Sequence, residues 1–167
     1  IHLSNLVIPL FLYIYDKTLT LYILFPLTIL FITIDILRIN NPYVKKLYNT
    51  FFKSITRNSE DDSLTGASYV FLSSTLIILF FPKSIAIASL MIMSISDTLA
   101  AIIGRMYGAV EINGKTLEGS VGFFLSSIFI VLIFSELNIF IAIFSVIVAT
   151  CAELYSPIND TLFVPIL

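Results

Sequence analysis

An aspartate lies within an otherwise uncharged apolar segment of the sequence. Asp97 follows Ser94-Ile95-Ser96 and precedes a run of small and apolar residues that ends at Arg105. A carboxylate is costly to place inside a membrane, so it needs either a partner or a function. Asp97 could form an ion pair with Arg105 or Arg38, or it could bind a cation or orient a hydroxyl group. We favour a functional role for Asp97.

Small residues follow Asp97 on one face of a predicted helix. Ala100, Gly104 and Gly108 are spaced four residues apart, and this spacing usually allows helices to pack closely. The same small face would also let a nucleotide or a phosphate group approach the backbone beside Asp97. The sequence is compatible with both interpretations.

A second group of polar residues precedes a later apolar run and reads Gly114-Lys115-Thr116-Leu117-Glu118-Gly119-Ser120. A helix that begins here would present N–H groups and the positive end of its dipole, which attract phosphate. Lys115 would add a positive charge, Glu118 could hold Mg²⁺, and Gly119 would let an anion approach. An ordinary capped helix start explains the same residues, and the local sequence taken alone favours that simpler interpretation.

Acidic residues also precede the third apolar run, in Arg57-Asn58-Ser59-Glu60-Asp61-Asp62-Ser63. Three consecutive acids could bind a divalent metal through their oxygens. Such a run is more often a solvated helix start that the helix dipole favours. Asp35 and Arg38 end an earlier run, so they could pair with each other or reach the same site.

Composition defines the environment in which these residues act. Of the 167 residues, 58% are hydrophobic and only 12% are charged, and glycine and proline number 6 each. Because ordinary globular chains carry about 25% charged residues, a soluble domain is excluded, and the small number of glycines and prolines excludes a disordered or collagen-like chain. The net charge of −2 gives no indication of a nucleic-acid partner. The single cysteine, Cys151, excludes an internal disulfide, and its apolar surroundings predict a buried thiol.

Uncharged runs predict the membrane segments, and they cover 1–15, 18–34, 63–82, 84–96, 119–135 and 137–152. The fourth run reaches the length of about 20 residues that crosses a bilayer only if it continues through Asp97 to Gly104. We therefore predict an all-α integral membrane protein with about six transmembrane helices, in a single polytopic domain over residues 1–167. The chain begins at Ile1 rather than Met, so we expect the native N-terminus to extend further.

The polar stretch 40–63, between the second and third spans, contains apolar residues at helical spacing with lysines between them. This pattern predicts an amphipathic helix that lies on the membrane surface or packs on the helix bundle.

Lysine and arginine predict the orientation of the spans. Seven of the nine lie in or beside the polar stretches 40–63 and 107–118, whereas Lys17 and Lys83 lie in other connections. Two spans separate the polar stretches, so both stretches belong to one side, which the positive-inside rule assigns to the cytoplasm. We expect the candidate site and both termini on that side of a plasma membrane or an endomembrane.

These motifs resemble the signature of the CTP-dependent lipid-alcohol kinases, which include the dolichol kinases, CTP-dependent diacylglycerol kinases and phytol kinases. The resemblance rests on Asp97-x-x-Ala100-x-x-x-Gly104-x-x-x-Gly108 and Lys115-x-x-Glu118-Gly119-Ser120, with further matches at Arg57-x-x-Glu60 and at Glu153 followed by Asn159-Asp160-Thr161. The family usually carries Asp-Asn where Asp160-Thr161 stand. The related phosphatidate cytidylyltransferases share the central pattern but carry a C-terminal signature that this sequence lacks.

The resemblance implies transfer of the γ-phosphoryl group of CTP to the hydroxyl of a membrane lipid alcohol: a dolichol or other polyprenol, a diacylglycerol-type lipid or another isoprenoid alcohol. It implies catalytic roles for Asp97, Lys115 and Glu118, and it implies Mg²⁺ or another divalent cation held by Asp97, Glu118 and Glu60. The residues it places around the nucleotide and its phosphates are Arg57, Ala100, Gly104, Arg105, Gly108, Gly119 and Ser120. The alternatives are a lipid cytidylyltransferase that makes a CDP-lipid, and a non-enzymatic membrane subunit or transporter. A homodimer is compatible with the sequence.

Overall fold

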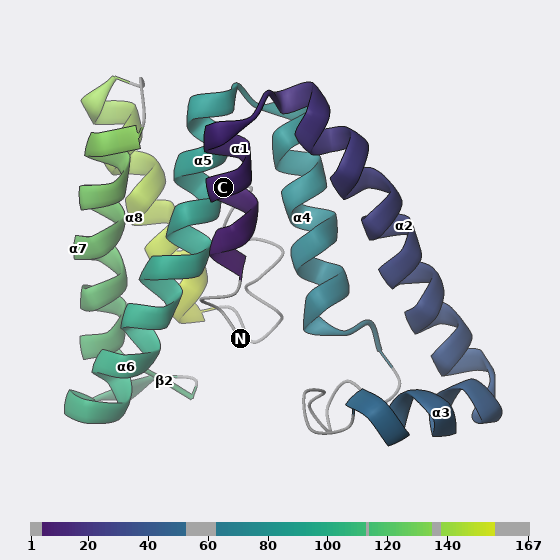
Figure 1. The fold of residues 1–167 in the computed structure, drawn as a ribbon. Coiled ribbons are helices and arrows are strands. Elements are labelled where there is room, and N and C mark those ends of the chain that lie inside the picture. The colour runs from purple at the N-terminus through teal and green to yellow at the C-terminus, as the bar shows by residue number, and fades with distance from the viewer. Residues whose placement is uncertain (1–4, 53–62, 113, 135–137, 156–167) are drawn as a thin grey trace.

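Helices in the structure follow the apolar runs of the sequence. The structure is a computed structural model, and it describes residues 5–52, 63–112, 114–134 and 138–155 (Figure 1). In chain order the elements are α1 (Val7–Ile14), α2 (Lys17–Asn40), α3 (Pro42–Phe52), α4 (Gly66–Phe80), α5 (Lys83–Met91), η3 (Ile92–Ser96), α6 (Asp97–Tyr107), β1 (Glu111–Ile112), β2 (Lys115–Thr116), α7 (Leu117–Phe134) and α8 (Ile139–Tyr155). The π-helix η3 joins α5 and α6 into one continuous helical segment, and the two strands form an antiparallel hairpin.

Three helical segments are long and apolar enough to cross a membrane: Lys17–Asn40, Lys83–Tyr107 and Leu117–Phe134. The second of these includes Asp97, as predicted. Helices α4 and α8 are shorter apolar helices, and α1 has only 8 residues. At a rise of about 1.5 Å per residue, α1 covers less than half of the hydrocarbon core of a bilayer. The prediction of an all-α membrane protein is confirmed, apart from the short hairpin, whereas the six transmembrane helices are not confirmed.

Successive long helices run in alternating directions, so their ends gather at two opposite ends of the molecule (Figure 1). Helices α2 and α4 lie side by side, while α5, α6, α7 and α8 form a second group, which α1 joins by packing against α5. The end with the hairpin, the last turns of α2 and α6 and the first turns of α4 and α7 is hereafter the hairpin end. The opposite end, with Lys17 and Lys83, is the lysine end.

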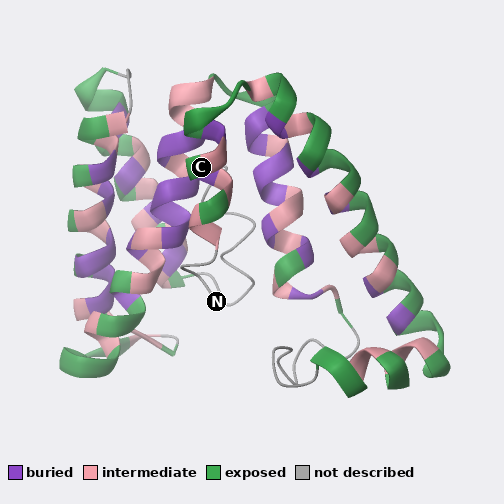
Figure 2. Cartoon of the chain, viewed as in Figure 1, coloured by how far each residue is buried: buried purple, intermediate pink, exposed green. Residues whose placement is uncertain are grey.

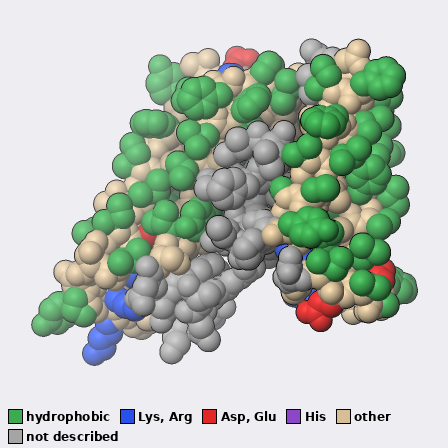
Figure 3. Space-filling model, turned by 180° about the vertical axis from the view of Figure 1, so that it is seen from behind, with side chains coloured by type: hydrophobic (Ala, Val, Ile, Leu, Met, Phe, Trp, Pro, Cys, Tyr) green, Lys and Arg blue, Asp and Glu red, His purple; other side chains and the backbone are tan. Residues whose placement is uncertain are grey.

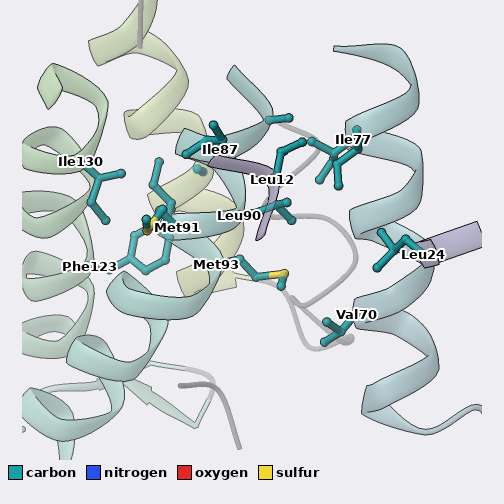
Figure 4. Close-up of a cluster of buried hydrophobic side chains, with 14 of the residues drawn as sticks. Leu12, Leu24, Val70, Ile77, Ile87, Leu90, Met91, Met93, Phe123 and Ile130 are labelled. Atoms are coloured by element: carbon teal, nitrogen blue, oxygen red, sulfur yellow. The ribbon is translucent and has the colours of Figure 1, made fainter. Parts of the chain in front are cut away.

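The hydrophobic core lies along α5, between the two groups of helices. Ala86 and Leu90 are fully buried there, and apolar side chains from α1, α2, α4 and α7 complete the cluster (Figure 4). The outward faces of α2, α7 and α8 instead carry large exposed hydrophobic side chains (Figure 2), and hydrophobic side chains cover the flanks of the molecule (Figure 3). Apolar surface on this scale suits contact with lipid rather than with water.

The predicted burial of Cys151 is wrong, because its thiol is exposed on α8. An apolar run in a helix that faces lipid does not have to be buried inside the protein. Apolar neighbours therefore give no information on which face of α8 packs against the other helices.

Helix α3 confirms a helix within the polar stretch 40–63, and it lies across the end of α2 (Figure 1). Tyr43, Leu47 and Phe51 form an exposed apolar stripe along it. On another side, the Tyr48 ring lies 5.0 Å from the Arg38 guanidinium, a distance at which a cation is attracted to an aromatic face. This contact attaches α3 to α2.

Two lysines tie helices together at the lysine end. The Lys17 ammonium, at the start of α2, donates to the carbonyl oxygens of Leu79 at 3.1 Å and Phe81 at 3.0 Å, at the end of α4. The Lys83 ammonium, at the start of α5, donates to two carbonyl oxygens at the end of α1, at 3.3 and 2.9 Å. The last carbonyls of a helix lack partners within it and carry the negative end of the dipole. Helices α1 and α2 form one helical hairpin, and α4 and α5 form another. Lys17 of the first hairpin caps α4, and Lys83 of the second caps α1.

A buried ion pair joins α2 to the start of α4 at the hairpin end. Asp35 Oδ1 lies 3.3 Å from Arg38 Nη2. Asp35 Oδ2 accepts hydrogen bonds from Thr65 N at 2.7 Å, Thr65 Oγ1 at 2.8 Å and Ser68 Oγ at 2.5 Å. Thr65 is the N-cap of α4, and Arg38 Nη2 donates to the Ser63 carbonyl oxygen at 2.7 Å. Of the two predicted alternatives for Asp35 and Arg38, pairing with each other is confirmed.

This junction predicts a stability difference between two identical substitutions on α2. Asp35→Asn would remove the negative charge beside the buried Arg38 guanidinium, and we expect it to lower the free energy of unfolding by about 3–5 kcal/mol. Asp16→Asn changes the exposed N-cap of the same helix, whose side chain makes no capping hydrogen bond, and should change stability by less than about 0.5 kcal/mol. Thermal unfolding of both variants in detergent is the measurement, and equal melting temperatures would contradict the role of Asp35.

Candidate functional site

A cavity at the hairpin end lies among α6, the hairpin, the first turn of α7 and the last turn of α8. Its volume is about 300 Å³, and its lining residues are Asp97, Ala100, Ala101, Gly104, Arg105, Gly114, Lys115, Thr116, Gly119, Ser120 and Glu153. Seven of them belong to the site predicted from the sequence: Asp97, Ala100, Gly104, Arg105, Lys115, Gly119 and Ser120. The structure therefore brings the two separate sequence motifs to the same cavity.

Asp97 begins α6 directly after the π-helix Ile92–Ser96. Short π-helical turns of this kind occur frequently at functional sites. The Thr98 hydroxyl donates to the Ser94 carbonyl oxygen at 2.6 Å, and Asp97 itself is half-buried at the cavity wall. A carboxylate at this place can meet a polar ligand in the cavity while the preceding turns stay in the apolar core.

Helices α6 and α7 approach each other closely at two glycines. A β-carbon on Gly104 would lie 2.6 Å from Thr116 Oγ1, and one on Gly119 would lie 2.8 Å from the Ala100 carbonyl oxygen. A β-carbon on Gly108 would lie 2.5 Å from Thr116 Cγ2. All three distances are too short for a real contact, so only glycine fits. The small face thus has the packing role that was one of its two predicted roles.

Lys115 extends from β2 to the last turn of α8. Its ammonium lies 2.9 Å from Glu153 Oε1 and donates to the Glu153 carbonyl oxygen at 2.6 Å. Glu153 Oε2 accepts a hydrogen bond from Ser120 Oγ at 3.0 Å. The Glu153 side chain is 6% exposed and that of Lys115 is 25% exposed. One carboxylate therefore ties the hairpin, α7 and α8 together at the cavity wall.

Glu118 and Gly108 belong to the predicted site but do not line the cavity. Glu118 Oε2 accepts a hydrogen bond from Val110 N at 3.4 Å, so its carboxylate lies over the segment that leads from α6 into the hairpin. The Thr116 side chain fills the space beside Gly108, where a β-carbon would otherwise lie. The predicted role of Glu118 as a metal ligand stays a prediction.

The start of α7 is partly occupied by contacts within the protein. Leu117 N donates to the Val110 carbonyl oxygen at 2.9 Å, and Gly119 N donates to Thr116 Oγ1 at 3.2 Å. Two of the N–H groups predicted to attract phosphate thus already have partners. Lys115 and Arg105 are the cationic side chains that line the cavity beside this helix start.

Some predicted residues lie outside the described part of the chain. Arg57 and Glu60 fall within residues 53–62, and Asp160 and Thr161 fall within residues 156–167. Their roles stay predictions.

Four lining residues were missing from the predicted site: Ala101, Gly114, Thr116 and Glu153. A signal was present for two of them. Gly114 follows an asparagine, a dipeptide typical of tight hairpin turns, and it has a φ of +82° that favours glycine. Glu153 is an acid next to the last apolar run, which is an expensive position unless the acid has a partner.

The charged side chains of the cavity balance one another. Asp97 and Glu153 are acidic, and Arg105 and Lys115 are basic, so the formal charge of the lining is zero. Among the described residues, no group of three or more His, Cys, Asp or Glu side chains is placed to hold a metal ion. Mg²⁺ is usually held by one or two carboxylates together with substrate phosphates. The donor set therefore fits a cation that enters with an anionic ligand.

The fold and this cavity define a helical membrane protein with a polar, charge-balanced cavity at one end of an apolar bundle. The chain is 35% identical to an uncharacterized protein of Rickettsia prowazekii, over 99% of this chain and 86% of that protein. It belongs to the same family as that protein. No family model and no solved structure matches the chain.

The chain is also similar to yeast enzymes of known class. It is 31% identical to CTP-dependent diacylglycerol kinase 1 of Schizosaccharomyces pombe, over 57% of this chain and 45% of that enzyme. It is 33% identical to the enzyme of the same name from Saccharomyces cerevisiae, over 61% of this chain and 37% of that enzyme. The chain thus spans less than half the length of these kinases. At the family level, the similarity supports a relation to CTP-dependent lipid kinases, as the sequence motifs predicted.

The close approach of α6 and α7 predicts different outcomes for two glycine substitutions. Gly104→Ala and Gly119→Ala should each lower stability by about 1–3 kcal/mol. The obstacle at Gly104 is the Thr116 hydroxyl, whereas the nearest obstacle at Gly119 is a backbone carbonyl. Introducing Thr116→Ala should therefore recover stability in the Gly104→Ala variant but not in the Gly119→Ala variant.

Thermal unfolding in detergent, with Thr116→Ala alone as the reference for each double variant, measures this difference. If Thr116→Ala recovered both glycine variants equally, the helices would not be in backbone contact at Gly119.

Proposed function

We propose that this protein transfers the γ-phosphoryl group of CTP to the hydroxyl group of a membrane lipid alcohol. The observation that carries the proposal is the cavity, where a half-buried carboxylate, two cations and a glycine-lined wall meet at one end of an apolar helix bundle. Phosphoryl transfer depends mainly on positioning and on electrostatic stabilisation, and these residue types provide both. The similarity to CTP-dependent diacylglycerol kinases supports CTP as the donor.

The position of the cavity suits a substrate with an apolar tail. The flanks of the molecule expose large hydrophobic side chains, so the tail would stay in the bilayer while its hydroxyl reached the hairpin end. A diacylglycerol-type lipid is the first acceptor to test because the related yeast enzymes are named for it. Dolichol, other polyprenols and shorter isoprenoid alcohols are the second class.

Asp97 would orient the attacking hydroxyl or accept its proton. Lys115 and Arg105 would bind phosphate oxygens, and the glycine-lined wall at Gly104 and Gly119 would let the nucleotide approach the backbone. Alternatively, Asp97 would hold a divalent cation, with Glu118 and Glu60 as the other predicted ligands. Mg²⁺, when bound, would neutralise part of the polyphosphate charge, which a lining of zero formal charge cannot do alone.

The distribution of cations supports a cytoplasmic position for the hairpin end. Arg38, Lys45, Lys46, Arg105 and Lys115 lie in elements that end or begin there, whereas Lys17 and Lys83 lie at the lysine end. Cytoplasmic segments carry the excess of lysine and arginine, and CTP is a cytoplasmic nucleotide. We therefore infer that the cavity lies on the cytoplasmic side of the membrane. Both termini, which the sequence predicts on the same side, lie outside the described residues.

Label transfer from CTP tests the proposed reaction. Membranes that contain the protein would receive CTP labelled at the γ or, separately, at the α phosphate, together with Mg²⁺ and diacylglycerol, dolichol or geranylgeraniol. We expect label in the lipid phase from γ-labelled CTP only. Label from the α position alone would indicate a cytidylyltransferase, and no label with any acceptor would favour a non-enzymatic membrane subunit or transporter.

The variant Asp97→Asn ties this reaction to the cavity. It keeps the size of the side chain, so we expect normal yield and melting temperature but a loss of activity of about 100-fold or more. Asp16→Asn, at the exposed start of α2, is the matched control and should keep full activity. A folded and fully active Asp97→Asn variant would remove Asp97 from the site.

Cysteine labelling tests the orientation. In a Cys151→Ala background, which removes the exposed native thiol, single cysteines would replace the exposed residues Glu111 at the hairpin end and Asp16 at the lysine end. We expect a membrane-impermeant reagent to label position 111 from the cytoplasmic side only and position 16 from the opposite side only. Labelling of both positions from one side would rule out this orientation.

A further inference from the structure

We propose that Glu153 is a positioning residue that fixes the Lys115 ammonium at the cavity wall, where it binds the phosphates of the nucleotide. This inference rests on the proposed function and extends it to a residue that the family resemblance includes but to which the sequence analysis gave no role. The contact between Glu153 and Lys115 also links two segments that lie far apart in the sequence, β2 and the last turn of α8.

Glu153 supplies two hydrogen-bond acceptors to the Lys115 ammonium. Lys115 Nζ lies 2.9 Å from the carboxylate oxygen Oε1 and 2.6 Å from the main-chain carbonyl oxygen of the same residue. A lysine side chain has many rotamers and loses much conformational entropy when it is held in one of them. Because the folded protein already holds Lys115 in place, the nucleotide would not have to order this side chain when it binds.

The second carboxylate oxygen of Glu153 is held as well. Oε2 accepts the Ser120 hydroxyl at 3.0 Å, and Ser120 lies in the first turn of α7 and is itself buried. With Oε1 on Lys115 and Oε2 on Ser120, neither oxygen is placed for proton transfer with a substrate. Glu153 therefore acts through Lys115, while Asp97 remains the carboxylate that faces the reacting groups.

The negative charge of Glu153 and its positioning of Lys115 predict opposite changes in anion binding when Glu153 is substituted. Glu153 contributes a negative charge to the cavity lining. If it acted only through that charge, Glu153→Gln would strengthen the binding of an anion. If it positions Lys115, the same substitution would weaken binding because the ammonium would lose its charged anchor.

The main experiment compares Glu153→Gln and Glu153→Asp with the wild-type protein and with Glu111→Gln, an exposed acid on the same hairpin. Glu153→Asp keeps the charge but is one methylene shorter, so it cannot reach both Lys115 and Ser120 from the same backbone. We expect both Glu153 variants to bind CTP and inorganic tripolyphosphate about tenfold more weakly in equilibrium dialysis, a change of about 1.4 kcal/mol. Glu111→Gln should bind like the wild type.

Kinetics and a double variant separate positioning from a general loss of structure. Lys115 contacts phosphates before and during the reaction, so the Glu153 variants should raise the KM for CTP about tenfold and change kcat less than about threefold. In a Lys115→Met background, Glu153→Gln should cause no further loss of CTP binding, because the two residues act as one unit. Ser120→Ala removes only the Oε2 contact and should give a smaller effect in the same direction.

Three results would overturn the inference. Glu153→Gln with unchanged or tighter CTP binding would do so while leaving the proposed function intact, and so would additive losses in the Lys115→Met background. If the wild-type protein bound neither CTP nor tripolyphosphate, both the inference and the proposed function would fail. If Glu153→Gln lowered the yield of folded protein, binding by the Ser120→Ala variant would decide, and wild-type affinity there would count against positioning.

Discussion

The close approach of α6 and α7 is the constraint on which the candidate site depends. Gly104 and Gly119 let the two backbones come so near that a single β-carbon would collide, and Thr116 lies between them. Because Thr116 belongs to β2, this packing also fixes the hairpin, and with it the neighbouring Lys115. Gly104, Gly119, Thr116 and Lys115 all line the cavity, so its glycine-lined wall and its lysine depend on the same helix contact.

The membrane environment explains where polar groups lie. Apart from Asp97, which lies within the segment Lys83–Tyr107, the ionised side chains of the long apolar helices lie toward the helix ends, and the buried ones have specific partners. Asp35 accepts hydrogen bonds at the start of α4 and forms an ion pair with Arg38. Glu153 forms an ion pair with Lys115 and accepts a hydrogen bond from Ser120. Removing a charged group from water without a partner costs several kcal/mol. The two junctions therefore differ in place but follow one rule, in which each buried acid receives both a cation and a hydroxyl.

The sequence predicted much of this arrangement because the signals were local. The four-residue spacing of Ala100, Gly104 and Gly108 defines one face of a helix, and a short connection returns the chain to Lys115, so both motifs had to meet. The position of Glu153 depends on which face of α8 meets α7, and the uniform apolarity of that run does not encode this choice. The same uniformity explains the wrong expectation for Cys151.

Other differences between prediction and structure have equally simple causes. Glu118 has the spacing of a ligand at a helix start, but it does not line the cavity, and its carboxylate accepts a hydrogen bond from Val110 N. Hydropathy also reports where a chain is apolar and not how far it stays helical. Within the described part of the run 1–15, which begins at residue 5, α1 covers Val7–Ile14.

The capping lysines have a mechanical consequence. Lys17 and Lys83 form four ammonium–carbonyl hydrogen bonds between the α1–α2 and α4–α5 helical hairpins. Each helical hairpin supplies the lysine that caps the C-terminus of a helix in the other, so the two hairpins are held together at the lysine end. Two helical hairpins that are held together at one end can rotate about that end, and the displacement of their residues grows with distance from it. Any relative movement of these two helical hairpins would therefore be smallest at the lysine end and largest at the hairpin end, where the cavity lies.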